Sequence, residues 1–136
     1  MSASADLVCV PPHLKRTIWP LVSDRLRAAY LKTDLAHTRE LERDVLEGDG
    51  DLWLATSGND IDAAAVTLLV RTDRHLICQI TAIGGKNLAR WLDLLPQIEA
   101  WAKREGAAKL RIMGRLGWAA ILDNYHVSNV VLERAL

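Results

Sequence analysis

Apolar positions recur along the chain with two different periods, and the order of these periods predicts the order of the elements. Residues 6–10 form a short apolar strand closed by two prolines, and apolar residues then recur at helical spacing as far as Ala29. Pro20 should kink or restart this helix. A second helix should use Thr33–Asp34 as its N-cap and stop before Gly48. The chain therefore begins with a strand and two helices.

Three strands should follow as a meander. They are expected at Asp51–Thr56, Ala63–Arg71 and His75–Ile83, joined by a hairpin turn over Ser57–Asp60 and a second turn near Thr72–Arg74. A long amphipathic helix comes next and places its apolar residues on one stripe. The expected members of this stripe are Leu88, Trp91, Leu92, Leu95, Ile98, Trp101 and Ala102.

The helix should end with Gly106 at its C′ position, and Pro96 either bends it or separates its first half. The end of the chain predicts a strand at Lys109–Met113, a helix from the Gly114 junction to about Tyr125, and a last strand at Val127–Glu133. This order implies an α/β fold in one domain, residues 1–136, with a single mixed, largely antiparallel sheet flanked by helices.

Composition narrows the function classes. The chain has 136 residues, 50% of them hydrophobic and 25% charged, which is typical of a soluble globular domain. Lys plus Arg and Asp plus Glu are both 17, and the basic residues are scattered, which argues against a nucleic-acid partner. No apolar run approaches the roughly 20 residues of a membrane span, and we expect no signal peptide, because the first residues have neither a basic start nor an apolar stretch. We expect no membrane partner and a cytoplasmic location.

Cysteine and histidine usage gives no metal motif. Cys9 and Cys78 lie in apolar segments far apart in the sequence, so we interpret both as buried free thiols rather than a disulfide or a metal site. The histidines are isolated and lack the spacing of metal ligands. We interpret each as a surface or helix-cap residue, and a catalytic role is the less favoured alternative. They are His13, His37, His75 and His126.

The glycine pair Gly84–Gly85, followed by Lys86 and a helix start, is a candidate anion site. Glycines free the backbone of Cβ constraints, and the N–H groups and dipole of the following helix favour a negative charge. The alternative is that the pair serves only to reverse the chain between a strand and a packed helix. The residues leave both interpretations open.

Several motifs together resemble a known family. These are Trp19–Pro20, Gly48–Trp53, Ile83–Gly85, Ile98–Gly106 and Gly114–Trp118. With the order of elements, they resemble the GNAT (acyl-CoA N-acyltransferase) superfamily, in its branch of small proteins common in phages and prophages. The resemblance covers nearly the whole chain.

The resemblance implies where acetyl-CoA would bind. The strand before the long helix would pair its backbone with the pantetheine arm, and the next loop would cradle the pyrophosphate. The implied cofactor-binding residues are Ile83, Gly84, Gly85, Lys86, Asn87, Leu88 and Ala89. Only Ala89 matches the family loop pattern; Asn87 stands where a glycine is usual. The strands on either side of the long helix should be parallel neighbours whose ends splay near Ile83 and Met113.

The remaining site residues are implied less directly. Tyr125 stands where the family has a tyrosine that protonates the leaving thiolate; a buried aromatic with a bonded hydroxyl is the alternative. The backbone N–H near Ile83 could polarise the carbonyl. Arg115 at the strand-to-helix junction could bind a phosphate, or pin the last helix through a salt bridge. Asp51 and Glu47 are the better candidates for a general base, and neither is singled out.

Two functions of different classes remain. The first is acetyl transfer from acetyl-CoA to an unknown amine. The second is a catalytically inactive GNAT-shaped phage protein that binds a phage or host protein or forms part of the virion, since fold does not fix function. The host-cell cytoplasm or the virion would be its location. Substrate identity cannot be inferred, and a homo-oligomer stays open.

Overall fold

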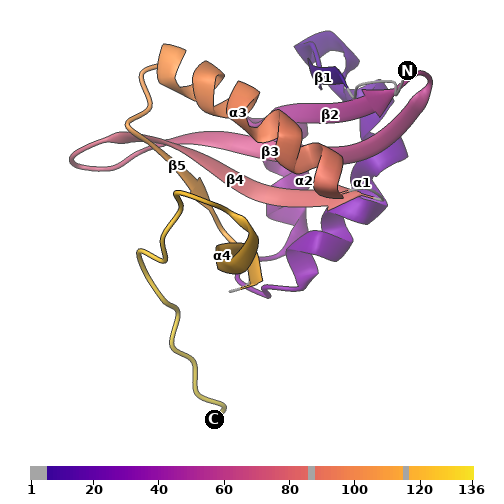
Figure 1. The fold of residues 1–136 in the computed structure, drawn as a ribbon. Helices are drawn as coiled ribbons and strands as arrows, with labels where there is room; N and C mark the ends of the chain where they lie inside the picture. Colours follow the sequence, from indigo (N-terminus) through magenta and orange to yellow (C-terminus); the bar gives the residue numbers. More distant parts are fainter. Residues whose placement is uncertain (1–5, 86–87, 115–116) are drawn as a thin grey trace.

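Five strands form one sheet in sequence order, with helices on both of its faces (Figure 1). The computed structural model describes residues 6–85, 88–114 and 117–136. The strands are β1 (Asp6–Cys9), β2 (Asp51–Ser57), β3 (Asp60–Arg71), β4 (Leu76–Gly85) and β5 (Lys109–Ile112). Neighbours from β1 to β4 are antiparallel, whereas β4 and β5 are parallel. The predicted mixed, largely antiparallel sheet flanked by helices is confirmed.

Two helical layers cover the sheet. A 3₁₀ turn, η1 (Pro12–Leu14), leads into α1 (Lys15–Leu31), and α2 (Thr38–Leu46) packs beside it on one face. The other face carries α3 (Leu88–Arg104), and the side chains that follow α4 (Gly117–Ile121) join the same core. No helix within the described residues is long and apolar enough to cross a membrane.

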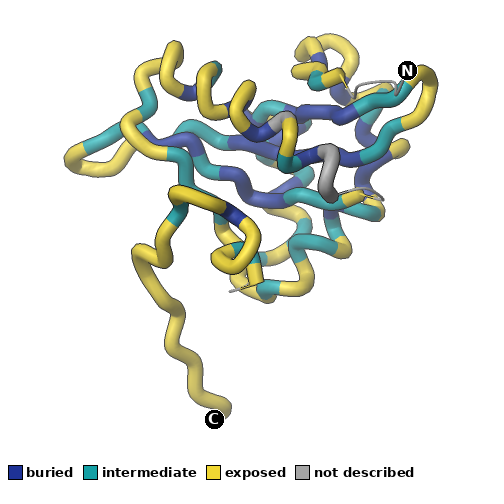
Figure 2. Tube along the Cα trace, viewed as in Figure 1, coloured by how far each residue is buried: buried dark blue, intermediate teal, exposed yellow. Residues whose placement is uncertain are grey.

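Alternation along the strands explains why the sheet has two cores. In β2, Leu52 and Leu54 pack toward α1 and α2, whereas Trp53 and Ala55 pack toward α3. Because both faces are covered, the strands read as nearly continuous apolar runs, and the sheet is the most deeply buried layer (Figure 2). Trp91 on α3 is the largest of the fully buried side chains among the described residues.

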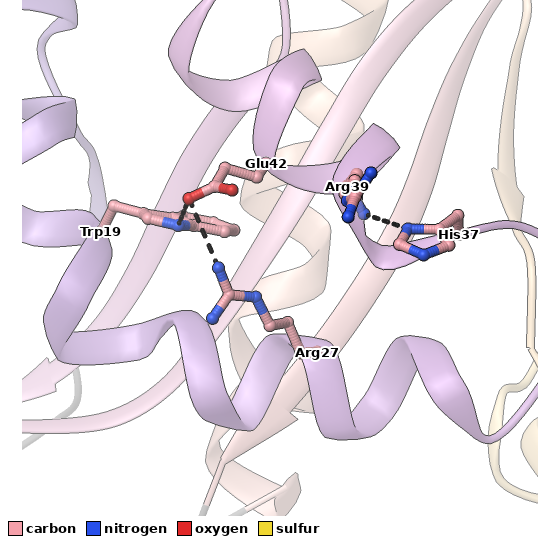
Figure 3. A network of polar contacts seen from close by, with 5 residues as sticks. All are labelled: Trp19, Arg27, His37, Arg39 and Glu42. Atoms are coloured by element: carbon pink, nitrogen blue, oxygen red, sulfur yellow. Dashed lines mark hydrogen bonds and ion pairs between the residues drawn. The ribbon is translucent and has the colours of Figure 1, made fainter.

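The first two helices begin and end differently from the sequence prediction. α1 runs as one helix through Pro20, so it does not restart there. Thr33 belongs to the end of α1, because its N–H and hydroxyl donate to the carbonyl of Tyr30. The N-cap of α2 is therefore His37, whose Nδ1 accepts the backbone N–H of Arg39 at 3.0 Å (Figure 3).

A polar clamp joins α1 to α2. Glu42 Oε1 accepts the indole N–H of Trp19 at 3.1 Å and a guanidinium N–H of Arg27 at 3.3 Å (Figure 3). The Arg27–Glu42 pair is about two-fifths exposed on each side, so it contributes little to stability. The bond from buried Trp19 matters more, since it satisfies a donor inside the first core.

Other turns follow the sequence closely. β2 and β3 are joined by a two-residue turn in which Gly58 has a φ of 60°. α3 continues through Pro96 to Arg104, and Gly106, with a φ of 92°, ends it as the expected C′ residue. The N–H of Ala107 then donates to the carbonyl of Ala102 at 2.9 Å.

Three predictions for the ends of the chain are wrong. α4 stops at Ile121 rather than near Tyr125, and Asn124, with a φ of 66°, turns the chain away. Residues 127–133 are not a strand, because they run away from the sheet and are exposed (Figures 1 and 2). Both cysteines are free, and only Cys78 is buried; Cys9 is exposed because β1 is an edge strand.

Candidate functional site

The two edges of β4 are paired to different lengths. Toward β3, pairing runs the full strand, from Leu76 opposite Arg71 to Gly85 opposite Ala63. Toward β5, the parallel ladder ends where Ile80 meets Ile112. The expected parallel neighbours are confirmed. The last five residues of β4, Thr81–Gly85, therefore extend beyond β5, and we call this segment the overhang.

A β-bulge marks the start of the overhang. Thr67 of β3 pairs with Ile80, and the next β3 residue, Val66, pairs with Ala82, so Thr81 is the extra residue. The Thr81 hydroxyl donates to the Val66 carbonyl at 3.4 Å. A bulge bends its strand and increases the local twist. β4 thus diverges from β5 where their ladder ends.

The divergence opens a cavity of about 700 Å³. Its walls come from the C-terminal half of α1 and the two residues after it, from the overhang, from the end of β5 and from α4. The volume lies in the range of small-molecule and cofactor sites. The larger apolar side chains in the wall are Ile80, Ile83, Ile112, Met113, Trp118 and Ile121. Both residues at which the splay was expected, Ile83 and Met113, are therefore in the wall.

Only positive charge lines the described part of this cavity. Arg25 of α1 and Lys32, the C-cap residue of α1, are in the wall, and no carboxylate is found among the described lining residues. One guanidinium nitrogen of Arg25 donates to the Ile61 carbonyl at 3.0 Å, which holds the side chain beside the overhang. A ligand with an anionic group and an apolar or extended part suits such a wall.

The glycine pair belongs to the strand itself. β4 was expected to end at Ile83, but it includes Gly84 and Gly85, and neither has a positive φ. A Cβ on Gly84 would lie 2.5 Å from the carbonyl oxygen of Arg25, and one on Gly85 would collide with the backbone of β3. Glycine is required here because α1 and β3 pass so close to β4.

The structure describes only some of the other residues predicted to bind the cofactor. Leu88 and Ala89 open α3, and two residues of the chain separate Leu88 from the end of the overhang at Gly85. Lys86, Asn87 and Arg115 lie outside the described residues.

Gly114 and Trp118 form the opposite wall of the cavity. Gly114 packs so closely on the Trp118 indole that a Cβ would lie 2.6 Å from Cδ1. A side chain at position 114 would therefore push the indole out of the wall.

Tyr125 lies on the α3 side of the sheet and is not among the described residues of the cavity wall. Its hydroxyl donates to Glu99 Oε2 at 2.8 Å. Burial, and next the hydrogen bond to Glu99, raise the pKa of the phenol well above its usual range. The hydroxyl is therefore protonated at neutral pH.

The two base candidates also lie outside the described cavity wall. Asp51 begins β2, opposite Thr67, and burial raises the pKa of its carboxyl group. Glu47 is the C-cap of α2. Among the described residues, no three His, Cys, Asp or Glu side chains gather as a metal site would require.

Sequence reasoning missed Arg25, Lys32 and Thr81. Arg25 sits on an amphipathic helix and Lys32 caps its C-terminus, where basic residues usually mark the solvated surface. Only the packing of α1 across the end of β4 turns them toward a cavity. Nothing in the sequence of this apolar strand marks the position of the bulge at Thr81.

Several solved structures with the same fold are described as acetyltransferases. An aminoglycoside acetyltransferase from an uncultured soil metagenomic sample, in complex with sisomicin, superposes with a TM-score of 0.71 at 8% identity, covering 98% of this chain and 96% of that one. A putative acetyl transferase from Pyrococcus furiosus gives 0.65 at 18%, covering 97% and 99%. A GNAT family acetyltransferase from Staphylococcus aureus gives 0.63 at 14%, covering 98% and 99%.

These likenesses show the fold: a five-stranded mixed sheet flanked by helices, as in GNAT acetyltransferases. No family model and no curated protein sequence matches the chain.

Proposed function

We infer that this protein transfers an acetyl group from acetyl-CoA to an amine. The observation that carries the proposal is the overhang: five residues of β4 continue past the end of β5 and border a cavity walled by two cations. The edge of the overhang toward β5 has no partner strand among the described residues. A strand edge without a partner offers N–H and C=O groups to an extended, amide-containing ligand. The pantetheine arm is such a ligand.

The chemistry of the wall fits the two ends of acetyl-CoA. Arg25 and Lys32 would face the phosphates, and the isoleucines and Met113 would pack on the arm. Lys86, Asn87, Leu88 and Ala89 would add backbone N–H groups at the start of α3, and Arg115 a second guanidinium. These assignments rest on their positions in the chain next to the wall.

The chain's own groups have two tasks in the reaction. Acetyl-CoA supplies the acetyl group as a thioester, so an N–C bond forms and the C–S bond breaks. The attacking nitrogen loses one proton to solvent, and the leaving thiolate takes one. The N–H of the overhang near Ile83 would polarise the carbonyl. Tyr125 would give the proton and then regain one from solvent. Its raised pKa makes it a weaker acid while the hydroxyl is bonded to Glu99, so proton transfer requires that this bond opens first. The hydroxyl would have to exchange its bond to Glu99 for one to sulfur.

Calorimetric titration with acetyl-CoA tests the site. We expect binding by the wild type and an affinity about tenfold lower for Arg25→Gln, because a charged hydrogen bond to phosphate is lost. Arg16→Gln is the matched control: it removes an exposed cation from the same helix, outside the described cavity wall. No heat with the wild type, or equal losses in both variants, would contradict the proposal.

Tyr125→Phe tests the proton donor. With an amine that the wild type acetylates, we expect CoA release to slow roughly 100-fold. Glu99→Ala removes the acceptor of the same hydrogen bond and should leave turnover within about threefold. If both variants lose the same stability and neither loses turnover, Tyr125 is architectural.

The inactive alternative finds no support in the fold or the comparisons. A binding component would be favoured by a tryptophan exposed in a patch. Trp19, Trp53 and Trp91 are buried, and Trp101 and Trp118 are half-buried. In addition, the Trp53 and Trp101 rings meet edge to face at a centroid distance of 5.1 Å, as core aromatics do.

A further inference from the structure

The turn between β3 and β4 and the start of β5 border a second cavity, of about 330 Å³. It lies at the far end of β4 from the overhang (Figure 1), and none of its described lining residues lines the first cavity. Its volume is at the lower end of the range for small-molecule sites. The polar and charged residues of its wall are Thr72, Asp73, Arg74, His75, Lys109 and Arg111. The acetyl transfer proposed above gives this cavity no task.

Three cations from distant parts of the sequence meet in this wall. Arg74 comes from the turn, whereas Lys109 and Arg111 belong to β5. β5 pairs in parallel with the start of β4, directly after the turn, and this pairing brings the two segments together. Because Leu110 packs in the core under α3, alternation directs Lys109 and Arg111 to the opposite face of the sheet. The fold thus concentrates positive charge that the sequence scatters.

These cations are not neutralised within the described part of the chain. The side chains of Arg74, Lys109 and Arg111 make no hydrogen bond or ion pair among the described residues. Arg111 is also half-buried, so its guanidinium loses part of its hydration without gaining a partner. Asp73 is the one carboxylate in the described wall, and three cations against it leave a net charge of +2. An anionic ligand would supply the missing partners.

Hydrogen bonds shape the turn before any ligand binds. The Thr72 hydroxyl accepts the backbone N–H groups of Arg74 at 3.3 Å and His75 at 3.1 Å. The Thr72 N–H donates to the His75 carbonyl at 2.8 Å. The N–H of Ala108 donates to the Leu76 carbonyl at 2.8 Å, which ties the start of β5 to the same end of β4. Because the wall is preformed, binding costs little ordering of the backbone.

We propose that this second cavity binds the phosphate group of a small molecule, which is inorganic phosphate or a phosphate monoester. A phosphate monoester carries roughly two negative charges near pH 7 and three strong acceptor oxygens. It balances the net charge of the wall and can accept bonds from several sides at once. A guanidinium binds two such oxygens in parallel, and a lysine ammonium adds a point charge. A carboxylate, with one charge, would leave part of the positive charge unbalanced.

Titrations of the isotope-labelled, full-length protein with inorganic phosphate and with glycerol 3-phosphate test the site. At constant ionic strength, we expect saturable shifts of the amide signals of Arg74, His75 and Lys109–Arg111, with a dissociation constant of about 1 mM or below. Glycerol 3-phosphate that binds about threefold or more tightly identifies a monoester as the ligand, and equal affinity identifies inorganic phosphate. Acetate should bind about tenfold more weakly, because it carries one charge.

Two variants of opposite charge change localise the binding. Arg111→Gln removes a cation from the wall and should weaken phosphate binding about tenfold. Asp73→Asn removes the carboxylate and should strengthen it about threefold. Arg16→Gln is the matched control, since it removes an exposed cation outside the described wall. Acetyl-CoA affinity should be the same in Arg111→Gln as in the wild type, so this test stands apart from that of the acetyl transfer.

Four results would overturn the proposal. The first is the absence of saturable shifts at these amides with both phosphate probes. The second is acetate binding as tight as phosphate binding, and the third is an equal loss in Arg16→Gln and Arg111→Gln. The fourth is a single-stranded oligonucleotide that binds the cavity more tightly than either small probe, because the cations would then belong to a nucleic-acid surface.

Discussion

The two halves of β4 differ in what surrounds them. Leu76–Ile80 pairs with β3 on one side and β5 on the other, and Ile77, Cys78 and Ile80 are buried. The overhang pairs only with β3 and borders the cavity, with Ile83 half-buried. One apolar run thus supplies both a structural strand and a ligand wall.

The change between the halves comes from a few local features. Thr81 adds one residue to the strand, β5 ends at Ile112, and two glycines let α1 and β3 pass close to the end of β4. None of these features alters the hydrophobic pattern. A substitution in the first half should therefore affect stability, and one in the overhang should affect ligand binding as well.

The largest expected effect is on the first half. Ile77→Ala removes a side chain that is 2% exposed and should cost about 3 kcal/mol of unfolding free energy, measured by urea denaturation. Acetyl-CoA affinity should not change. Ile83→Ala is the matched change in the overhang; it should cost about 1 kcal/mol and weaken acetyl-CoA binding several-fold. Equal stability losses would mean that the overhang is ordinary core.

Two glycine-to-alanine variants test how closely α1 packs against the end of the overhang. Gly84→Ala places a methyl group 2.5 Å from the Arg25 carbonyl oxygen, so α1 must shift at a cost of about 2 kcal/mol. Gly117→Ala adds the same group in open space at the start of α4 and should change stability by less than about 0.5 kcal/mol. Thermal melts of the two variants measure the difference. Similar melting temperatures would show that α1 does not constrain β4.

Hydrogen exchange compares the halves directly. Acetyl-CoA at ten times its dissociation constant stabilises the bound state by about 1.4 kcal/mol, so amides that open locally in the overhang should exchange about tenfold more slowly. Amides of Leu76–Ile80 that exchange through openings which leave the overhang closed should show little change. Uniform protection of both halves would instead indicate binding elsewhere or a global effect.

Sequence reasoning identified the strand that borders the cavity but not the feature that opens it. Periodicity located β4 and α3 because both bury an apolar pattern, and Gly106 marked the end of α3. The bulge at Thr81 and the approach of Arg25 depend on contacts between distant segments, which leave no local pattern.

In residues 127–133 the opposite happened: the sequence has a local strand pattern, but the structure has no strand there. Their β propensity is real, yet a strand needs a partner, and none among the described residues lies beside them.

The smallest expected effect concerns Asp51, which pairs opposite Thr67 at the level where the two halves of β4 meet. Burial raises the pKa of its carboxyl group in the folded state, followed by an opposing effect of Lys15. Between the unfolded and folded pKa values the folded state binds more protons, so stability falls as pH rises through that window and stays reduced above it.

Asp51→Asn removes this cost. Its melting temperature should exceed that of the wild type slightly at pH 7, and the gain should fade as the pH is lowered through the folded pKa of Asp51 toward the unfolded value near 4. Lys15 keeps its bond to the Gly50 carbonyl at 2.6 Å, so its position does not depend on the carboxylate. Acetyl-CoA affinity should be unchanged, because Asp51 is outside the described cavity wall. A loss of affinity would extend the ligand site beyond the overhang, into the half of β4 that we assign to structure.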